Sequence, residues 1–362
     1  MMEPTVRRHT ARVFQRAVDL CLALGSVSAT YRTEKVPVTS NWTLAHAPGC
    51  DRVVAKAGWA SIVAPTMIRA SNVRKAYGAT VAVDGASFDI PRGETFGLLG
   101  PNGAGKTTTI HLLVGVLKPD AGEIEIDGAL DPTRPEVRRR IGIAPQSLAL
   151  YDELTGEENL RFFGRLYGVN GPNLRDRVRW ALEFVQLTEH GGRLVRTYSG
   201  GMQRRLNMAC ALLHEPAVIL FDEPTVGVDP QSRNHIFDNI EALKAEGRTI
   251  LYTTHYMEEA QRLCDRVAIM DHGKVLAMDT VDGLITRYGG RSVVTAELER
   301  PPDHPADLPG TLEGTSLRLD TDEPLEEVAR LAAANVRFLT LRVDRPDLET
   351  VFLSLTGRSL RD

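Results

Sequence analysis

The chain has 362 residues, of which 43% are hydrophobic; this is an ordinary globular composition, long enough for two or three domains. Its 43 basic and 47 acidic residues leave a net charge of −4, which gives no support for a nucleic-acid-binding surface, and we predict no nucleic-acid partner. No run of about 18 apolar residues occurs, so the sequence predicts no membrane-spanning helix. The four cysteines form no CxxC pair and have no zinc-ligand spacing, and we interpret them as reduced thiols.

Residues 1–66 have no sustained hydrophobic period and no motif. We expect a poorly structured N-terminal extension, or an upstream in-frame translation with the natural start at Met67. Residues 17–29 and the arginines before them faintly resemble a signal or transit peptide, but the apolar run is short and contains Asp19.

Predicted strands and helices alternate from residue 67 to about 285. The strands 217–222 and 249–255 are continuous apolar runs, as expected for parallel strands that are buried on both faces. This alternation predicts an α/β domain with a mainly parallel sheet. Further strands are expected from residue 67 and at 94–100 and 123–128, and helices from Lys106 and at 172–187.

The chain changes character after this domain. We predict a hinge at residues 286–300, and a loop at 301–310 because that segment contains four prolines. A helix at 325–334, a strand at 337–343 and a helix at 346–357 then follow. The sequence therefore predicts a small α+β C-terminal domain over residues 290–362.

A phosphate-binding loop, GPNGAGKT, fits the pattern G-x-x-x-x-G-K-[ST] and lies between a predicted strand and a predicted helix. Its glycines let backbone N–H groups surround phosphates, Lys106 supplies a positive charge, and the Thr107 hydroxyl suits Mg²⁺. The predicted phosphate-binding residues are Gly100, Pro101, Asn102, Gly103, Ala104, Gly105, Lys106, Thr107 and Thr108.

Two acids follow the buried strand at 217–222. A carboxylate at the end of such a strand is costly without a cation or hydrogen bonds, so we predict that Asp222 binds Mg²⁺. Glu223 is placed to polarise an attacking water. The alternative is that both are plain turn acids.

Three further residues occupy places that suit a nucleotide site. His255 ends the next strand, so it can reach a γ-phosphate, and Gln146 also follows a strand, so its amide can reach Mg²⁺ or water. Tyr77 precedes the loop and can stack on adenine. Each also has a structural interpretation, as a packing histidine, a surface glutamine or a core aromatic.

A second segment, YSGGMQRRL, places Ser199, Gly200 and Gly201 before a predicted helix, which favours anion binding. It lacks a lysine and lies far from the first loop. Its role becomes clear only from the order of the motifs.

Over residues 67–285 the chain resembles the ATPase subunits of ABC transporters, because seven motifs occur in the order of that family: Tyr77, GPNGAGKT, Gln146, YSGGMQ, VILFDE, GVDP and His255. The resemblance implies a P-loop ATPase domain at residues 67–289, in which a mainly parallel core carries an antiparallel β subdomain and a helical subdomain. It also implies ATP and Mg²⁺ as cofactors.

The family's roles transfer to the matching residues. Gln146 senses Mg²⁺ and the membrane partner, Glu223 is the general base, and His255 contacts the γ-phosphate. Asp229 links the halves of a dimer, in which Ser199 and Gly201 complete the site of the other copy. Catalysis is thereby assigned to Glu223, His255, Gln146 and Lys106, and Mg²⁺ binding to Thr107, Gln146 and Asp222.

Tyr198 and Met202 replace the usual leucine and glutamine of the signature loop, and the C-terminal domain resembles that of ABC-2 type exporters, including daunorubicin/doxorubicin-resistance-like ATPases. This branch implies efflux, with antibiotics among the candidate cargoes, a homodimer or paired ATPase subunit, a separate ABC-2 type permease, and a cytoplasmic location on the inner face of the membrane. Residues 150–168 resemble the start of the helical subdomain that receives the permease, and equally describe a surface helix capped at Thr155. The alternatives are an importer ATPase and a soluble ABC ATPase that acts on ribosomes or DNA.

Overall fold

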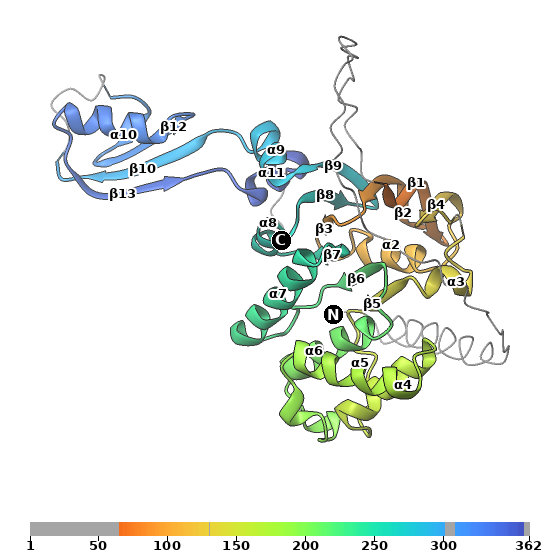
Figure 1. Cartoon of the computed structure of the whole chain (residues 1–362). Coiled ribbons are helices and arrows are strands. Elements are labelled where there is room, and N and C mark those ends of the chain that lie inside the picture. The colour runs from red at the N-terminus through yellow and green to blue at the C-terminus, as the bar shows by residue number, and fades with distance from the viewer. Residues whose placement is uncertain (1–64, 130, 301–307, 358–362) are drawn as a thin grey trace, which may run out of the picture. The chain divides into compact units, whose positions relative to one another are not determined.

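Three β-sheets organise the part of the chain that the computed structural model describes, which is residues 65–129, 131–300 and 308–357 (Figure 1). The predictions for the N-terminal extension, for residues 17–29 and for most of the proline-rich loop lie outside these ranges. Cys210 and Cys264 lie inside them, and both are buried free thiols.

The central sheet has six strands in the order β5 (Ile141–Ala144), β6 (Val218–Asp222), β7 (Thr249–Thr254), β3 (Thr95–Leu99), β8 (Arg266–Asp271) and β9 (Lys274–Thr280). The first five strands are parallel, and β9 pairs antiparallel with β8. Every residue of β3, β6 and β7 is buried. The predicted mainly parallel, doubly covered sheet is therefore confirmed.

Alternate residues of these strands enter two different cores. One core includes α2 (Lys106–Leu113) and the antiparallel sheet β2–β1–β4, with bounds Thr80–Pro91, Thr66–Tyr77 and Ala121–Ile126. The other includes α7 (Pro230–Ala245) and α8 (Met257–Leu263). A short helix, α3 (Pro135–Arg138), precedes β5.

A helical subdomain with its own core lies between β5 and β6. It contains α4 (Gly156–Leu166), α5 (Gly171–Phe184) and α6 (Gly200–Leu212), with 3₁₀ turns at Thr188–His190 and Val195–Thr197. The predicted cap at Thr155 is confirmed, because Thr155 and Glu158 form a capping box. Two arginines join α5 to α6: Arg177 donates to the carbonyls of Leu212 and Leu213, and Arg205 donates to that of Val185. Each arginine thereby satisfies carbonyls at the C-terminal end of the other helix.

The segment after β9 corrects one prediction. Residues 286–300 were expected to form a hinge, but they contain the end of α9 (Val281–Tyr288) and the strand β10 (Ser292–Leu298), which has neighbours on both sides. The alternation of apolar and polar residues in 292–298 is short, and the segment contains charged and small residues. The sequence pattern therefore did not identify this strand. The second antiparallel sheet has the order β11 (Thr311–Glu313), β12 (Ser316–Thr321), β10 and β13 (Phe338–Asp344).

The two predicted C-terminal helices and the strand between them are confirmed, as α10 (Pro324–Ala333), β13 and α11 (Leu348–Thr356). Leu348, Val351 and Phe352 of α11 are buried in the same core as α7 and α8, so this helix packs against the ATPase-like core. The domain boundary at 289/290 stays a prediction.

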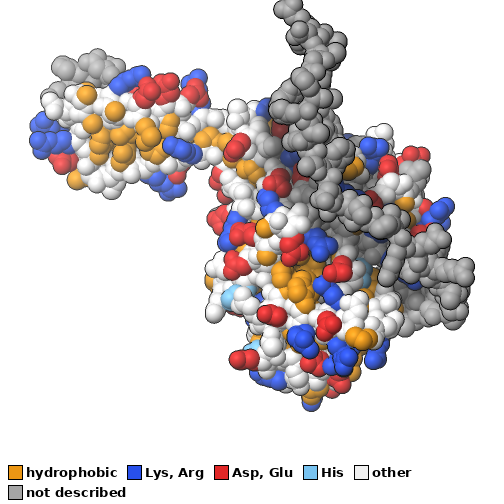
Figure 2. Space-filling model, viewed as in Figure 1, with side chains coloured by type: hydrophobic (Ala, Val, Ile, Leu, Met, Phe, Trp, Pro, Cys, Tyr) orange, Lys and Arg blue, Asp and Glu red, His pale blue; other side chains and the backbone are white. Residues whose placement is uncertain are grey.

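Hydrophobic side chains gather on the surface over β10 and β13 (Figure 2). Among the residues of β13, Leu339 and Leu341 are exposed. Within the described ranges, no helix combines the length and the hydropathy that crossing a membrane requires.

Candidate active site

The segment Gly100–Thr107 contains the loop between β3 and α2 and the first two residues of α2, at the carboxyl edge of the parallel strands. Gly105 has φ 107°, and a β-carbon there would lie 2.3 Å from the carbonyl oxygen of Ala82. A β-carbon at Gly100 would lie 2.1 Å from the carbonyl oxygen of Met270. These positions require glycine because the backbone is packed tightly between β2 and β8.

Helix α2 presents its N-terminus to this loop. No side chain caps the helix and its first turn carries no acid, and the first intrahelical bond is donated by Thr109 to Gly105. The N–H groups of Lys106, Thr107 and Thr108 precede that bond, so they are available to an anion.

Lys106 lies at the centre of the site, and its side chain is only 4% exposed. Its ammonium donates to the carbonyl oxygens of Gly100 (2.7 Å) and Pro101 (3.0 Å) and forms an ion pair with Glu223 Oε1 (3.0 Å). These three contacts use all three of its donors.

Glu223 brings the catalytic candidates together. Its other oxygen accepts a hydrogen bond from Gln146 Nε2 (2.9 Å), and His255 Nδ1 lies 3.4 Å from Oε1 without hydrogen-bond geometry. The backbone of Glu223 is left-handed, with φ 46°, and its N–H donates to Thr253 Oγ1 (3.0 Å). The structure thus places Lys106, Gln146, Glu223 and His255 around one carboxylate.

Asp222 is 1% exposed, and burial raises the pKa of its carboxyl, although hydrogen bonds from Thr253 (2.6 Å) and Thr107 oppose this effect. No ion pair to Asp222 occurs among the described residues. A buried carboxyl without a cationic partner, bonded to the hydroxyl of the phosphate loop, fits the hard oxygen ligands that Mg²⁺ prefers. Gln146 uses its amide nitrogen on Glu223, which leaves the amide oxygen for a cation.

The second motif forms a separate surface. Ser199 caps α6 and accepts from the N–H of Met202 (3.2 Å), while Asp229 caps α7 and accepts from that of Ser232 (2.9 Å). A β-carbon at Gly201 would lie 2.1 Å from Ser232 Oγ, so the two helix starts are in contact. Within the described ranges, no hydrogen bond or ion pair joins Ser199, Gly200 or Gly201 to the Lys106–Glu223 group.

The two tyrosines have different environments. Tyr77 ends β1 and is 50% exposed, so its ring is accessible to a stacking partner. Tyr198 is 6% exposed, and its hydroxyl donates to the carbonyl of His190 (2.6 Å). Tyr198 therefore packs in the helical subdomain rather than contacting a ligand.

Sequence reasoning missed several residues that hold this site. Glu259 is 2% exposed, and its carboxylate accepts from the hydroxyls of Thr225 (2.7 Å), Tyr252 (2.8 Å) and Thr254 (2.7 Å). It thereby ties the loop after Glu223 to the strand that carries His255. The signal was an acid one turn after His255, which a single sequence does not distinguish from a surface acid.

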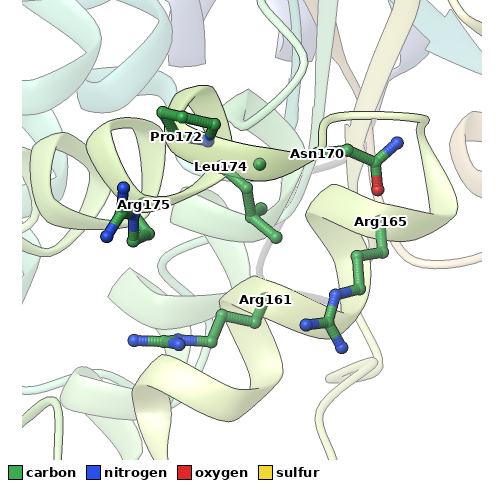
Figure 3. A pocket seen from close by; sticks show the side chains of 7 residues that line it. Arg161, Arg165, Asn170, Pro172, Leu174 and Arg175 are labelled. Carbon is green, nitrogen blue, oxygen red and sulfur yellow. The ribbon is translucent and has the colours of Figure 1, made fainter.

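A surface pocket of about 450 Å³ lies elsewhere, between α4 and α5 (Figure 3). None of the predicted site residues lines it. The lining residues are Arg161, Arg165, Asn170, Gly171, Pro172, Leu174 and Arg175.

Comparisons with known proteins agree with this geometry. The family model "ABC transporter" matches residues 83–226. The linearmycin resistance ATP-binding protein LnrL of Bacillus subtilis is 41% identical over 82% of this chain and 100% of its own length. The Nod factor export ATP-binding protein I of Ralstonia nicotianae is 41% identical over 82% and 95%, and the daunorubicin resistance ATP-binding protein DrrA3 of Streptomyces coeruleorubidus is 41% identical over 83% and 99%.

A solved structure is also similar. The ATP-binding cassette MJ0796, in a dimeric post-hydrolysis state bound to ADP and Pi, is 27% identical with a TM-score of 0.55, over 59% of this chain and 98% of its own.

Proposed function

This chain belongs to the ABC transporter family as an ATP-binding subunit, and we propose that it works as a dimer that powers export through a separate ABC-2 type membrane permease. It is an ATPase, and relatives named for linearmycin resistance, daunorubicin resistance and Nod factor export support an exporter. We propose a drug-like small molecule as the cargo, because two of those names describe resistance to an antibiotic.

The convergence of Lys106, Gln146 and His255 on Glu223 carries the ATP-hydrolysis part of this proposal. In our mechanism, Lys106 and the free N–H groups of α2 hold the β- and γ-phosphates, and the exposed ring of Tyr77 stacks on adenine. Glu223 orients and deprotonates the attacking water, Gln146 holds its carboxylate, and His255 reaches the γ-phosphate.

Asp222 and Thr107 are the residues that we propose for Mg²⁺, with the amide oxygen of Gln146. When bound, the cation neutralises charge on the phosphates. Burial of Asp222 beside two hydroxyl groups keeps this corner dry and fixes the carboxylate. Catalysis in this reaction class depends mainly on such positioning and charge stabilisation.

Dimerisation explains the second motif. Ser199, Gly200 and Gly201 form an uncharged helix start, which lies next to the cap of α7 at Asp229. The N–H groups of such a helix start suit the phosphates of a nucleotide held by another copy. The dimeric state of the MJ0796 cassette supports this arrangement. Each pair then contains two composite sites, and we place the pair on the cytoplasmic face of the membrane, bound to the permease.

Purified protein tests the site and the dimer together. Glu223→Gln should keep ATP binding, lose hydrolysis and sediment as a dimer with ATP, whereas Ser199→Arg should bind ATP as a monomer. Lys106→Ala should lose binding. Near-normal hydrolysis by Glu223→Gln would show that another group is the base, and an ATP-dependent Ser199→Arg dimer would exclude the composite site.

Transport needs a separate test. The chain should co-purify from membranes with a permease, and vesicles that contain both should move an antibiotic only with hydrolysable ATP. The Glu223→Gln pair is the matched control. Co-purification with ribosomes instead of a permease would contradict the export proposal.

A further inference from the structure

Helix α6 holds the loop that carries Gln146. Asn207 Nδ2 donates to the carbonyl of Pro145 (3.2 Å), and Asn207 Oδ1 accepts from the N–H of Ala149 (3.3 Å). One turn earlier, Arg204 Nη1 donates to the carbonyl of Gln146 itself. Residues three apart lie on the same face of a helix, so Arg204 and Asn207 form one clamp on this loop.

The guanidinium of Arg204 also reaches a second loop. Its Nη2 donates to the carbonyl of Val226 (3.3 Å), in the segment that follows Glu223. Burial lowers the pKa of Arg204, and the attraction of the carboxylates of Glu223 and Asp222 opposes this effect. The guanidinium charge therefore lies close enough to interact with these two acids. An arginine stays protonated in proteins, and its planar fork is suited to binding two acceptors at once.

These contacts form a continuous connection. Ser199 caps α6, Arg204 follows on the same helix, and Arg204 fixes the backbone of Gln146, whose side chain donates to Glu223. A helix is stiff over so few residues, so a displacement of its N-terminus would also move the two loops that Arg204 binds.

We propose that Arg204 is a positioning residue for ATP hydrolysis, which sets Gln146 against Glu223 and links that geometry to the signature surface at the start of α6. This inference rests on the proposed role of Glu223 as the base. Arg204 touches no reacting atom itself; it acts through two backbone carbonyls, one in each loop that flanks the carboxylate of Glu223.

The neighbouring arginine is a matched control. Arg205 lies on the same helix, is partly buried like Arg204, and donates to the carbonyls of Val185 (2.9 Å) and Gln186 (3.4 Å). Those acceptors belong to the end of α5, so Arg205 holds the helical subdomain together without contacting the loops of the site. Arg204 and Arg205 thus differ in which carbonyls they bind.

The test compares Arg204→Met with Arg205→Met in the full-length protein, because both variants remove a guanidinium and keep a long apolar stem. We expect Arg204→Met to lower kcat about tenfold to a hundredfold with an unchanged KM for ATP, since small misplacements of catalytic groups have effects of this size. Arg205→Met should lower the melting temperature and leave kcat per folded molecule unchanged. Arg204→Lys should recover part of the lost kcat, and it also serves if Arg204→Met does not fold.

A double mutant identifies the route. If Arg204 acts through Gln146, then adding Arg204→Met to Gln146→Ala should lower kcat no further than Gln146→Ala alone. Fully additive losses, or equal losses of kcat in Arg204→Met and Arg205→Met, would overturn the proposal. The base assignment is judged separately, from the turnover of Glu223→Gln, so a failure of that assignment is distinguishable from a failure of this one.

Discussion

The buried ion pair between Lys106 and Glu223 predicts that removing the charge of Glu223 strengthens ATP binding while it abolishes turnover. The three donors of Lys106 already bind Gly100, Pro101 and Glu223. A phosphate oxygen can therefore bind this ammonium only by displacing one of them. Glu223 is the charged acceptor, and both partners are only 4% exposed, so its contact is the strongest of the three.

The size of the effect follows from the contacts that remain in Glu223→Gln. A hydrogen bond to a charged group contributes about 1.5–3 kcal/mol. In the variant, Lys106 keeps two carbonyl acceptors, and the amide oxygen of the glutamine can still accept a hydrogen bond. We therefore expect the contacts of Lys106 in the nucleotide-free variant to be weaker by about 1 kcal/mol. Phosphates replace the missing acceptor in the complex, so the Kd for ATP should fall about fivefold. Loss of the base should lower kcat at least about a hundredfold.

Calorimetric titration with ATP in EDTA measures this Kd without hydrolysis. Dimer formation also tightens apparent binding, so both proteins should carry Ser199→Arg, and the comparison is then made on monomers. An unchanged or higher Kd for the Glu223→Gln protein would refute the idea that the carboxylate competes with phosphate for Lys106.

Two further predictions concern stability. Burial raises the pKa of Glu94 to about 7, against the attraction of Arg266. The folded protein therefore keeps a proton that the unfolded chain releases above about pH 4.5. The stabilisation from this proton falls as the pH rises from about 4.5 and is lost once the pH has passed about 7. Between pH 6 and 8 the free energy of unfolding, measured by urea denaturation, should fall by about 1 kcal/mol more in the wild type than in Glu94→Gln. Equal decreases in the two proteins would contradict this prediction. At Gly201, a β-carbon would lie 2.1 Å from Ser232 Oγ, so Gly201→Ala should lower the free energy of unfolding by about 1–3 kcal/mol. In sedimentation experiments with ATP, this variant should also dimerise poorly. Gly200→Ala is the control, because nothing lies closer than 4.0 Å to its β-carbon; equal melting temperatures of the two variants would refute the argument.

The sequence predicted the elements that carry strong local signals. The phosphate loop, the buried strands β6 and β7 and the capped helix α4 each depend on a pattern within a few residues, and they occur where they were expected. The strand β10 was missed because its stability comes from β12 and β13, which lie later in the chain. Local patterns carry little information about such pairing.

The contacts among site residues were beyond the sequence for a related reason. The motifs placed Lys106 and Glu223 in one site, but not in a direct ion pair, because that contact depends on where a loop and a strand end meet in three dimensions. Arg204 was not identified as a site residue at all. It follows the signature glycines in a segment with a second arginine beside it, and nothing local distinguishes an arginine that binds Gln146 and Val226 from one that binds the end of α5.

The side chains of the adjacent acids Asp222 and Glu223 are held apart by a residue of the neighbouring strand. Successive residues of a strand point in opposite directions, so Asp222 and Glu223 at the end of β6 need not serve the same partner. Thr253 of the neighbouring strand β7 enforces the separation, since its hydroxyl donates to Asp222 Oδ1 and accepts from the N–H of Glu223. The left-handed backbone of Glu223 then turns its carboxylate to Lys106 while that of Asp222 stays with Thr107. One hydroxyl thus lets two consecutive carboxylates serve different partners: one is placed for the cation and the other for the attacking water.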